Sequence, residues 1–274
     1  MIRLVVTDLD RTLLRDDGSI SDHTAQIFKK VKEKGILVAI ATGRSAVEAE
    51  YAANRINADR YIITYTGAKV LDMAENSSIY EQFLEEKTAV KLLRLLSEYE
   101  RIFCIVYASG RTLVLPGSFE SMKDKTDHAE FFASAKKQLI DVSDPIQYIE
   151  QTHIGVNKIF VMNLPEEKID EIWKRTVEDT DDVDMMITSP LGIDFLKKGV
   201  NKGKGLNALI SHLGIRRDEV MIFGDSGNDL DMFQEGFFKV AVKNASPQII
   251  ARADYVTRTN NDDGVAYALE KLIL

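Results

Sequence analysis

The sequence predicts an α/β protein with a parallel-sheet core and an inserted α+β module, and three patterns support this prediction. Continuous apolar runs at 4–6, 36–41 and 61–64 are typical of strands that are covered on both faces. Helical periodicity separates the first two runs, which indicates parallel strands joined by a helix. In the middle of the chain short turns join the strands instead, and the alternation of strand and helix returns near the end.

The first helix is predicted between Ser21 and Gly35, because positions 24, 27, 28 and 31 share one helix face. Ser21 is a suitable N-cap, and Gly35 suits the left-handed residue that ends many helices. From about residue 82 the pattern changes to that of an α+β module. Its expected elements are a Leu-rich helix around 90–96, a hairpin of 103–107 and 111–115, a strand at 157–163, a helix at 169–177, and a hairpin of 185–188 and 192–196.

The C-terminal part returns to the core pattern, with helices expected at 206–213 and 262–274 and short apolar strands at 220–223 and 238–242. We therefore predict two domains. The core comprises residues 1–82 and 189–274, and the inserted domain comprises residues 83–188. A chain of 274 residues is long enough for both domains to bury a hydrophobic core.

The charge balance restricts the partners of the protein. Lys and Arg number 35 against 43 Asp and Glu, which gives a formal net charge of -8. Nucleic acids and anionic membranes require a basic surface, so neither is expected as a partner. An anionic small molecule is still possible as a substrate, provided that the site contains local cations.

The location is expected to be cytoplasmic. No apolar run approaches the ~18 residues that span a bilayer, and charge appears too early at the N-terminus for a secretory signal. Cys104 is the single cysteine and lies in an apolar run, which indicates a buried, inert thiol. The four His residues have no metal-ligand spacing.

Asp8 and Asp10 follow the first predicted strand, where open α/β sheets place their ligands. On an extended segment residues i and i+2 point the same way, so we expect the two carboxylates to share a small space. Such a pair requires a proton or a cation between its members. The same two-acid pattern also occurs in solvated loops, and the motif alone does not separate these alternatives.

A second acidic cluster follows the predicted strand at 220–223. Asp225, Asp229 and Asp231 lie within seven residues, together with two glycines that allow a tight turn. Carboxylates at the ends of two core strands suit Mg²⁺, which binds few protein oxygens and retains several waters. A helix-capping role would explain Asp229 but not the whole cluster.

Two segments supply groups that bind phosphate. Thr42, Gly43 and Arg44 end the second strand and offer a hydroxyl, an accessible N–H and a guanidinium. Lys202 lies in a Gly-rich segment where a helix begins, and helix N-termini favour anions. Each signal is weak alone, because a lysine in such a loop is usually solvated.

Together these segments resemble the Cof-type phosphatases of subgroup IIB in the haloacid dehalogenase superfamily. The resemblance rests on residues 8–13, 41–44, 200–203 and 224–229, which match four motifs in order, and on residues 242–245 and 263–265. It implies a Rossmann-like core with a C2-type cap inserted between the second and third motifs. The cap would determine specificity.

The resemblance also implies roles for the matching residues. Asp8 would be the nucleophile and Asp10 the general acid and base. Mg²⁺ would be bound by Asp8, the main-chain carbonyl of Asp10, and Asp225, with Asp229 as a ligand or as a residue that orders the water around the ion. Phosphate would be bound by Leu9, Thr42, Gly43, Lys202 and Asn228. We further expect Arg44 to lie near the substrate's leaving group.

Two residues depart from the family pattern. Arg11 replaces a common Gly, and we expect it to point to solvent; the alternative is that it reaches the substrate entrance. Thr66 replaces an Asn near the expected boundary between the domains, which affects substrate contacts more than phosphoryl chemistry. Residues 116–145 either shape the pocket or form a solvated surface.

The function predicted from these observations is a Mg²⁺-dependent phosphatase that acts on a small phosphorylated metabolite, with sugar phosphates as the expected class. A sugar phosphomutase with the same core chemistry is an alternative, as is a non-catalytic phosphometabolite sensor. The intact acid and lysine set favours catalysis over sensing. The sequence does not distinguish a monomer from a homodimer, and it does not identify the physiological substrate.

Overall fold

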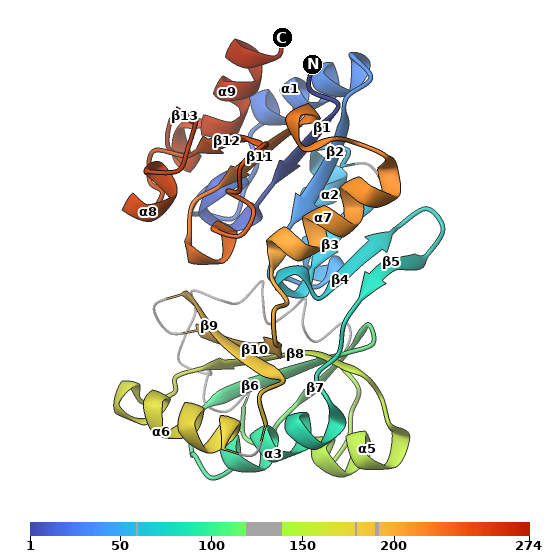
Figure 1. Cartoon of the computed structure of the whole chain (residues 1–274), viewed down its shortest axis with the longest axis vertical. Helices are drawn as coiled ribbons and strands as arrows, with labels where there is room; N and C mark the ends of the chain where they lie inside the picture. Colours follow the sequence, from blue (N-terminus) through green and yellow to red (C-terminus); the bar gives the residue numbers. More distant parts are fainter. Residues whose placement is uncertain (59, 119–138, 179, 190–191) are drawn as a thin grey trace. The chain divides into compact units, whose positions relative to one another are not determined.

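The computed structural model describes residues 1–58, 60–118, 139–178, 180–189 and 192–274. Two compact units are present (Figure 1). The first combines Met1–Glu81 with Asn201–Leu274, and the second is Gln82–Val200. Among the described residues, no helix has both the length and the apolar character required to cross a membrane.

Within the described ranges, the first unit contains a mixed sheet of eight strands in the order β13-β12-β11-β1-β2-β3-β4-β5. The last two of these strands are antiparallel to their neighbours, and the others run parallel. This arrangement confirms the predicted α/β class. The strands are β1 (Leu4–Thr7), β2 (Leu37–Ala41), β3 (Tyr61–Thr64), β4 (Lys69–Asp72), β5 (Ser77–Glu81), β11 (Val220–Gly224), β12 (Phe238–Ala241) and β13 (Tyr255–Val256).

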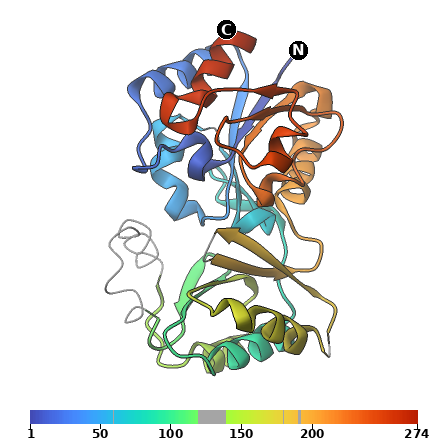
Figure 2. The ribbon, with the colours of Figure 1, turned by 90° about the vertical axis from the view of Figure 1, so that its left-hand side faces the viewer.

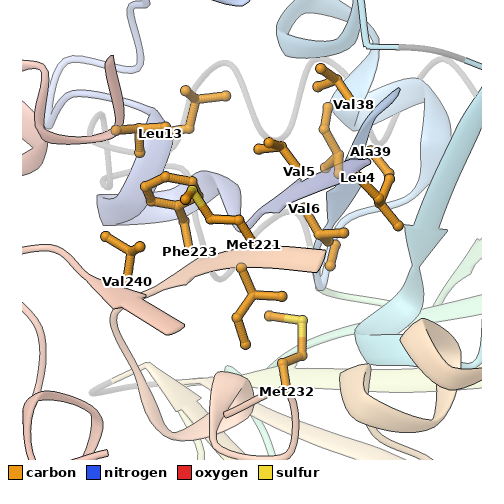
Figure 3. Close-up of a cluster of buried hydrophobic side chains, with 14 of the residues drawn as sticks. Leu4, Val5, Val6, Leu13, Val38, Ala39, Met221, Phe223, Met232 and Val240 are labelled. Carbon is orange, nitrogen blue, oxygen red and sulfur yellow. The ribbon is translucent and has the colours of Figure 1, made fainter. Parts of the chain in front are cut away.

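Helices cover both faces of this sheet, which explains why its central strands are apolar throughout. Figure 2 shows α1 and α9 on one face and α7 on the other. Figure 3 shows the core around β1 and β11, where Val5, Val6 and Phe223 are fully buried. The helices are α1 (Asp22–Glu33), α2 (Ala46–Arg55), α7 (Lys202–Leu213), α8 (Pro247–Ile250) and α9 (Gly264–Leu272).

The predicted start and end of α1 are confirmed. The Ser21 hydroxyl accepts a hydrogen bond from the backbone N–H of Thr24, as an N-cap does. Gly35 has a φ of 76°, the left-handed value expected just beyond a helix end.

The second unit has the predicted α+β character. In the part that the structure describes, five antiparallel strands take the order β7-β6-β8-β10-β9. Figure 1 shows its three labelled helices along one face of that sheet, where Cys104 is fully buried. The elements are α3 (Glu86–Leu96), β6 (Phe103–Ala108), β7 (Arg111–Val114), α5 (Pro145–Thr152), β8 (Val156–Met162), α6 (Glu166–Val177), β9 (Val183–Ser189) and β10 (Gly192–Lys197).

The return to the core differs from the expected position. We predicted that the core resumes at residue 189, but the first unit resumes at Asn201. The reason is that β10 pairs with both β8 and β9 and is therefore an interior strand of the second sheet. The hairpin predicted from 185–188 and 192–196 does form, and both of its strands belong to the second unit.

A hairpin of β4 and β5 and the helix α2 were not predicted. The turn before β4 contains Tyr65, Thr66 and Gly67, which all have positive φ values of 51°, 56° and 96°. A β-branched residue such as Thr66 rarely adopts positive φ, so the residue types at 65–66 do not predict a turn here. The turn packs directly against the start of α7.

Gly67→Ala tests this packing. A Cβ at Gly67 would lie 2.0 Å from the carbonyl oxygen of Asn201, so we expect a loss of roughly 3 kcal/mol or more in the free energy of unfolding. Gly35→Ala is the matched control, because Gly35 also has positive φ but no heavy atom within 4 Å of the added Cβ. It should lose only about 1–2 kcal/mol. Equal losses in urea unfolding would contradict the close contact.

Candidate active site

Asp8 and Asp225 lie at the carboxyl ends of two adjacent parallel strands. Thr7 is paired with Phe223 in the register of β1 and β11, and the backbone N–H of Asp8 donates to the carbonyl of Phe223 at 3.1 Å. In the sheet β1 lies between β2 and β11. From β1 the next strands of the chain extend the sheet on the side of β2, and the later strands, beginning with β11, extend it on the opposite side, so the strand order reverses at β1. Open α/β sheets bind ligands at such a point.

Lys202 joins this edge from the first turn of α7. Asn201 caps that helix by accepting from the backbone N–H of Lys204 at 2.8 Å. The Lys202 ammonium donates to Oδ1 of Asp8 at 2.6 Å and to Oδ1 of Asp229 at 2.8 Å. Because Lys202 is 0% exposed, water does not replace these two contacts.

Asp229 organises the loop that follows β11. Its Oδ2 accepts from the backbone N–H groups of Asp225 and Ser226, at 3.0 and 3.1 Å, while Oδ1 accepts from Lys202. A Cβ on Gly224 would lie 2.8 Å from the Asp229 carboxylate carbon, which explains a glycine at the end of the strand. Both oxygens of Asp229 are therefore engaged, which favours an ordering role over direct metal binding.

The cluster contains more negative charge than Lys202 neutralises. Oxygens of Asp8, Asp225 and Asp229 all lie within 4.8 Å of one another, and all three residues are buried. Burial raises the pKa of Asp8 well above its ordinary value, and Lys202 opposes this shift. Burial, together with the charge of Asp229, raises the pKa of Asp225 to about 6. A divalent cation would remove this excess charge.

The donor set fits Mg²⁺. Oδ1 of Asp8 accepts from Lys202, and Oδ1 of Asp225 accepts from the Thr12 hydroxyl at 3.1 Å. Within the part of the chain that the structure describes, Oδ2 of each residue has no hydrogen-bond partner. Two carboxylate oxygens at one edge are the few hard ligands that Mg²⁺ takes from a protein. The contact of the Thr12 hydroxyl with Asp225 was not predicted, although Thr12 lies within the first motif.

Asp10 and Arg44 form an ion pair. Arg44 donates from Nη2 to Oδ1 of Asp10 at 2.5 Å and from Nε to Oδ2 at 3.1 Å. We expected Asp8 and Asp10 to lie close together, and the charge of Asp10 does contribute, after burial, to the raised pKa of Asp8. Each carboxylate nevertheless has its own cation, and the Asp10 side chain is 56% exposed. The two acids take separate partners because the chain between them is not a continuous extended strand: an irregular helical turn, Leu9–Leu13, begins directly after Asp8.

The other predicted phosphate ligands lie on the loops around this edge. Thr42 is buried directly after β2, and its hydroxyl accepts from the backbone N–H of Arg44 at 3.1 Å. Gly43 is partly buried between them. Asn228 accepts from the Ser226 hydroxyl at 2.9 Å, and the carbonyl of Leu9 accepts from Leu14 at 2.8 Å.

The two departures from the family pattern have structural explanations. Arg11 is exposed, as expected, and its positive φ is the conformation that a glycine adopts most easily. Thr66 also has positive φ but is fully buried, and its N–H donates to the carbonyl of Thr42 at 3.0 Å. It therefore supports the second motif of the core. Of the predicted specificity segment 116–145, residues 119–138 lie outside the described residues.

Comparison with known proteins identifies the family. A family model described as haloacid dehalogenase-like hydrolase matches residues 5–269. The chain belongs to this family. The expected Cof-type assignment and the enzyme class, a phosphatase of this type, are confirmed at family level.

Individual relatives match this haloacid dehalogenase-like hydrolase over its full length. The 5-amino-6-(5-phospho-D-ribitylamino)uracil phosphatase YcsE of Bacillus subtilis is 28% identical over 274 residues, 100% of this chain and 96% of the relative. A putative phosphatase of Mycoplasma genitalium is 24% identical over 99% of each chain. The crystal structure of a haloacid dehalogenase-like hydrolase from Bacteroides thetaiotaomicron has a TM-score of 0.85 and 23% identity, and covers 100% of both chains.

Asp225→Asn tests the charge excess in metal-free protein. Below pH 3.8 the Asp225 carboxyl of the wild-type protein is protonated in both the folded and the unfolded chain, so the wild-type protein and the variant should be equally stable. Above pH 6 the wild-type protein must ionise a buried acid whose pKa is raised, so the variant should gain roughly 3 kcal/mol in the free energy of unfolding. Urea unfolding with EDTA at several pH values measures this.

The control is Asp141→Asn at an exposed aspartate, which should change little at any pH. A gain for Asp225→Asn that is constant with pH, or a loss at pH 7, would contradict the raised pKa.

Proposed function

We propose that the chain is a Mg²⁺-dependent phosphatase that hydrolyses small phosphorylated metabolites through a phosphoaspartate at Asp8. The observation that carries this proposal is the buried group of Asp8, Asp225 and Asp229 around Lys202, with oxygens within 4.8 Å. Such a cluster has an unbalanced negative charge where a phosphate must bind. A metal ion and a fixed ammonium are what permit a carboxylate to approach an anionic phosphate.

Mg²⁺ would be held by Asp8, Asp225 and the main-chain carbonyl of Asp10, with Asp229 keeping the loop and Lys202 in place. When bound, the ion supplies Lewis-acid stabilisation of negative charge on the phosphoryl oxygens. Lys202 supplies a second positive charge at Asp8 that does not depend on metal. Leu9, Thr42, Gly43 and Asn228 are proposed to orient the phosphate through N–H, hydroxyl and amide groups.

The reaction divides into two displacements. In the first, Asp8 attacks phosphorus, the bond from phosphorus to the alcohol oxygen breaks, and Asp10 donates a proton to the leaving alcohol. In the second, a water attacks the phosphoaspartate while the Asp10 carboxylate accepts its proton. The bond between phosphorus and Asp8 then breaks, which releases inorganic phosphate and returns both acids to their starting forms.

Arg44 is proposed to orient Asp10. The sequence suggested a place near the substrate's leaving group, and the two-point ion pair supports a role through the acid that protonates this group. A planar guanidinium that binds both oxygens fixes the orientation of the carboxylate, the form in which Asp10 accepts a proton from water; when Asp10 donates a proton to the leaving alcohol, one of the two contacts must open. Asp10 needs this restraint because its side chain is exposed.

The proposed substrates are sugar phosphates and related phosphorylated polyols. Support comes from the proposed divalent cation and Lys202, whose positive charges would together accept a phosphate monoester, and from the relative YcsE, whose name specifies a phosphorylated ribityl group. We propose that the second unit determines which of these substrates is accepted. A cytoplasmic location is consistent with such metabolites and with the buried thiol of Cys104.

Asp8→Asn tests the nucleophile. Wild-type protein with Mg²⁺ should release phosphate from 4-nitrophenyl phosphate over many turnovers, and the variant should lose at least about 10³-fold in kcat because an amide does not form the phosphoaspartate. EDTA should abolish the wild-type activity, and excess Mg²⁺ should restore it.

Lys204→Met, on the same helix but exposed, is the control and should retain activity. Multiple turnovers by Asp8→Asn would overturn the proposed mechanism. Transfer of labelled phosphate between hexose phosphate isomers, without free phosphate, would indicate the mutase instead.

A further inference from the structure

The turn after β12, residues 242–246, contacts both of the loops that carry the catalytic acids. Nδ2 of Asn244 donates to the carbonyl oxygen of Arg11 at 2.8 Å, next to Asp10. The backbone N–H of Ser246 donates to the carbonyl of Asp225 at 2.8 Å. One short turn therefore fixes the loop after β1 and the loop after β11.

The orientation of the Asn244 amide is determined by its second contact. Its Oδ1 accepts from the backbone N–H of Asn260 at 3.0 Å, so Nδ2 must face Arg11. Asn260 is only 3% exposed, and it donates to the carbonyl of Leu14 at 3.0 Å and to Asp16 at 2.9 Å. The two asparagines thus hold both ends of the segment that follows Asp10.

The residue that Asn244 holds is conformationally strained. Arg11 has φ 60° and ψ 6°, a left-handed conformation that is unfavourable for a residue with a Cβ. Asp10, immediately before it, is extended with φ -69° and ψ 123°. If Arg11 relaxed to negative φ, the peptide between the two residues would turn and the Asp10 carboxyl would be redirected. A hydrogen bond to the Arg11 carbonyl opposes that change.

We propose that Asn244 is a positioning residue for Asp10 and acts by holding Arg11 in its left-handed conformation. The proposal rests on the proposed role of Asp10 as the general acid and base. Asp8 is restrained by Lys202, and Asp225 by Thr12 and Ser246. Arg44 holds the side chain of Asp10, whereas the backbone next to Asp10 is held by Asn244 through Arg11. Loss of the Asn244 amide should therefore impair proton transfer more than nucleophilic attack or metal binding.

Two aryl phosphates of similar shape separate these effects. Phenyl phosphate releases a basic phenolate that requires a proton, whereas 4-nitrophenyl phosphate releases a stabilised phenolate that needs little help. The measure is kcat/KM, which reports the steps up to release of the alcohol and excludes hydrolysis of the phosphoaspartate, the step that both substrates share. Asn244→Ala should lower kcat/KM for phenyl phosphate by about 10-fold or more and for 4-nitrophenyl phosphate by less than about 3-fold. The Mg²⁺ concentration for half-maximal activity should stay within about 2-fold.

Rescue by Arg11→Gly tests the proposed cause. Glycine adopts positive φ without the Cβ penalty, so adding Arg11→Gly to Asn244→Ala should restore at least about 3-fold of the lost kcat/KM for phenyl phosphate. Asn244→Asp keeps the Oδ1 acceptor but places a negatively charged oxygen against the Arg11 carbonyl, so its selective loss should be at least as large as that of the alanine variant, which it replaces if that variant does not fold. Asn261→Ala is the control, because Asn261 contacts Asp16 and not Arg11.

Asp10→Asn is the reference variant. Its loss of kcat/KM on phenyl phosphate, relative to its loss on 4-nitrophenyl phosphate, should be larger than that of Asn244→Ala, about 10²-fold or more. Equal effects of Asp10→Asn on both substrates would overturn the acid role of Asp10 itself. If Asp10→Asn is selective but the Asn244 variants affect both substrates equally, or if Arg11→Gly gives no rescue, the positioning role of Asn244 is wrong.

Discussion

Lys202 places a fully buried ammonium group between Asp8 and Asp229, and the rest of the site depends on this contact. Through it the start of α7 is joined to the ends of β1 and β11. Removing the lysine would leave two buried carboxylates without a cation, which is among the most unfavourable changes that a protein interior can undergo. The tight packing of Gly67 on Asn201 and the cap of α7 both serve to place this one group.

The charge of the whole chain is a poor guide to its ligand. A formal charge of -8 discourages polyanions in general, but the site is governed by a few groups that are shielded from solvent. Three acids and Lys202 leave a local negative excess, which favours a divalent cation. Burial, with a smaller contribution from the neighbouring carboxylates, raises the pKa of Asp8 and Asp225. Asp10 is paired with Arg44 and exposed, which suits the proposed role of a group that exchanges protons with substrate and water.

Local patterns predicted the central parts of the molecule. Asp8 and Asp225 were identified because each follows a continuous apolar run, and the capping of α1 by Ser21 needs only neighbouring residues. Features that depend on distant pairing were missed. The sequence does not reveal that Arg44 binds Asp10, that β10 joins the second sheet, or that Asp229 uses both oxygens internally. Arg11 shows the same limit, because its left-handed conformation is stabilised by Asn244, 233 residues away.

Without a metal ion, the buried carboxylates of Asp8, Asp225 and Asp229 carry excess negative charge and in part retain protons. A divalent cation that binds there should neutralise the charge and displace these protons. Calorimetric titration with Mg²⁺ at pH 5.5 and pH 8, in buffers of different ionisation enthalpy, measures this exchange most directly. The account predicts saturable binding that releases at least about half a proton per ion at pH 5.5, decreasing at pH 8 as Asp225 ionises. Saturable binding without proton release at pH 5.5, or no saturable binding at either pH, would contradict it.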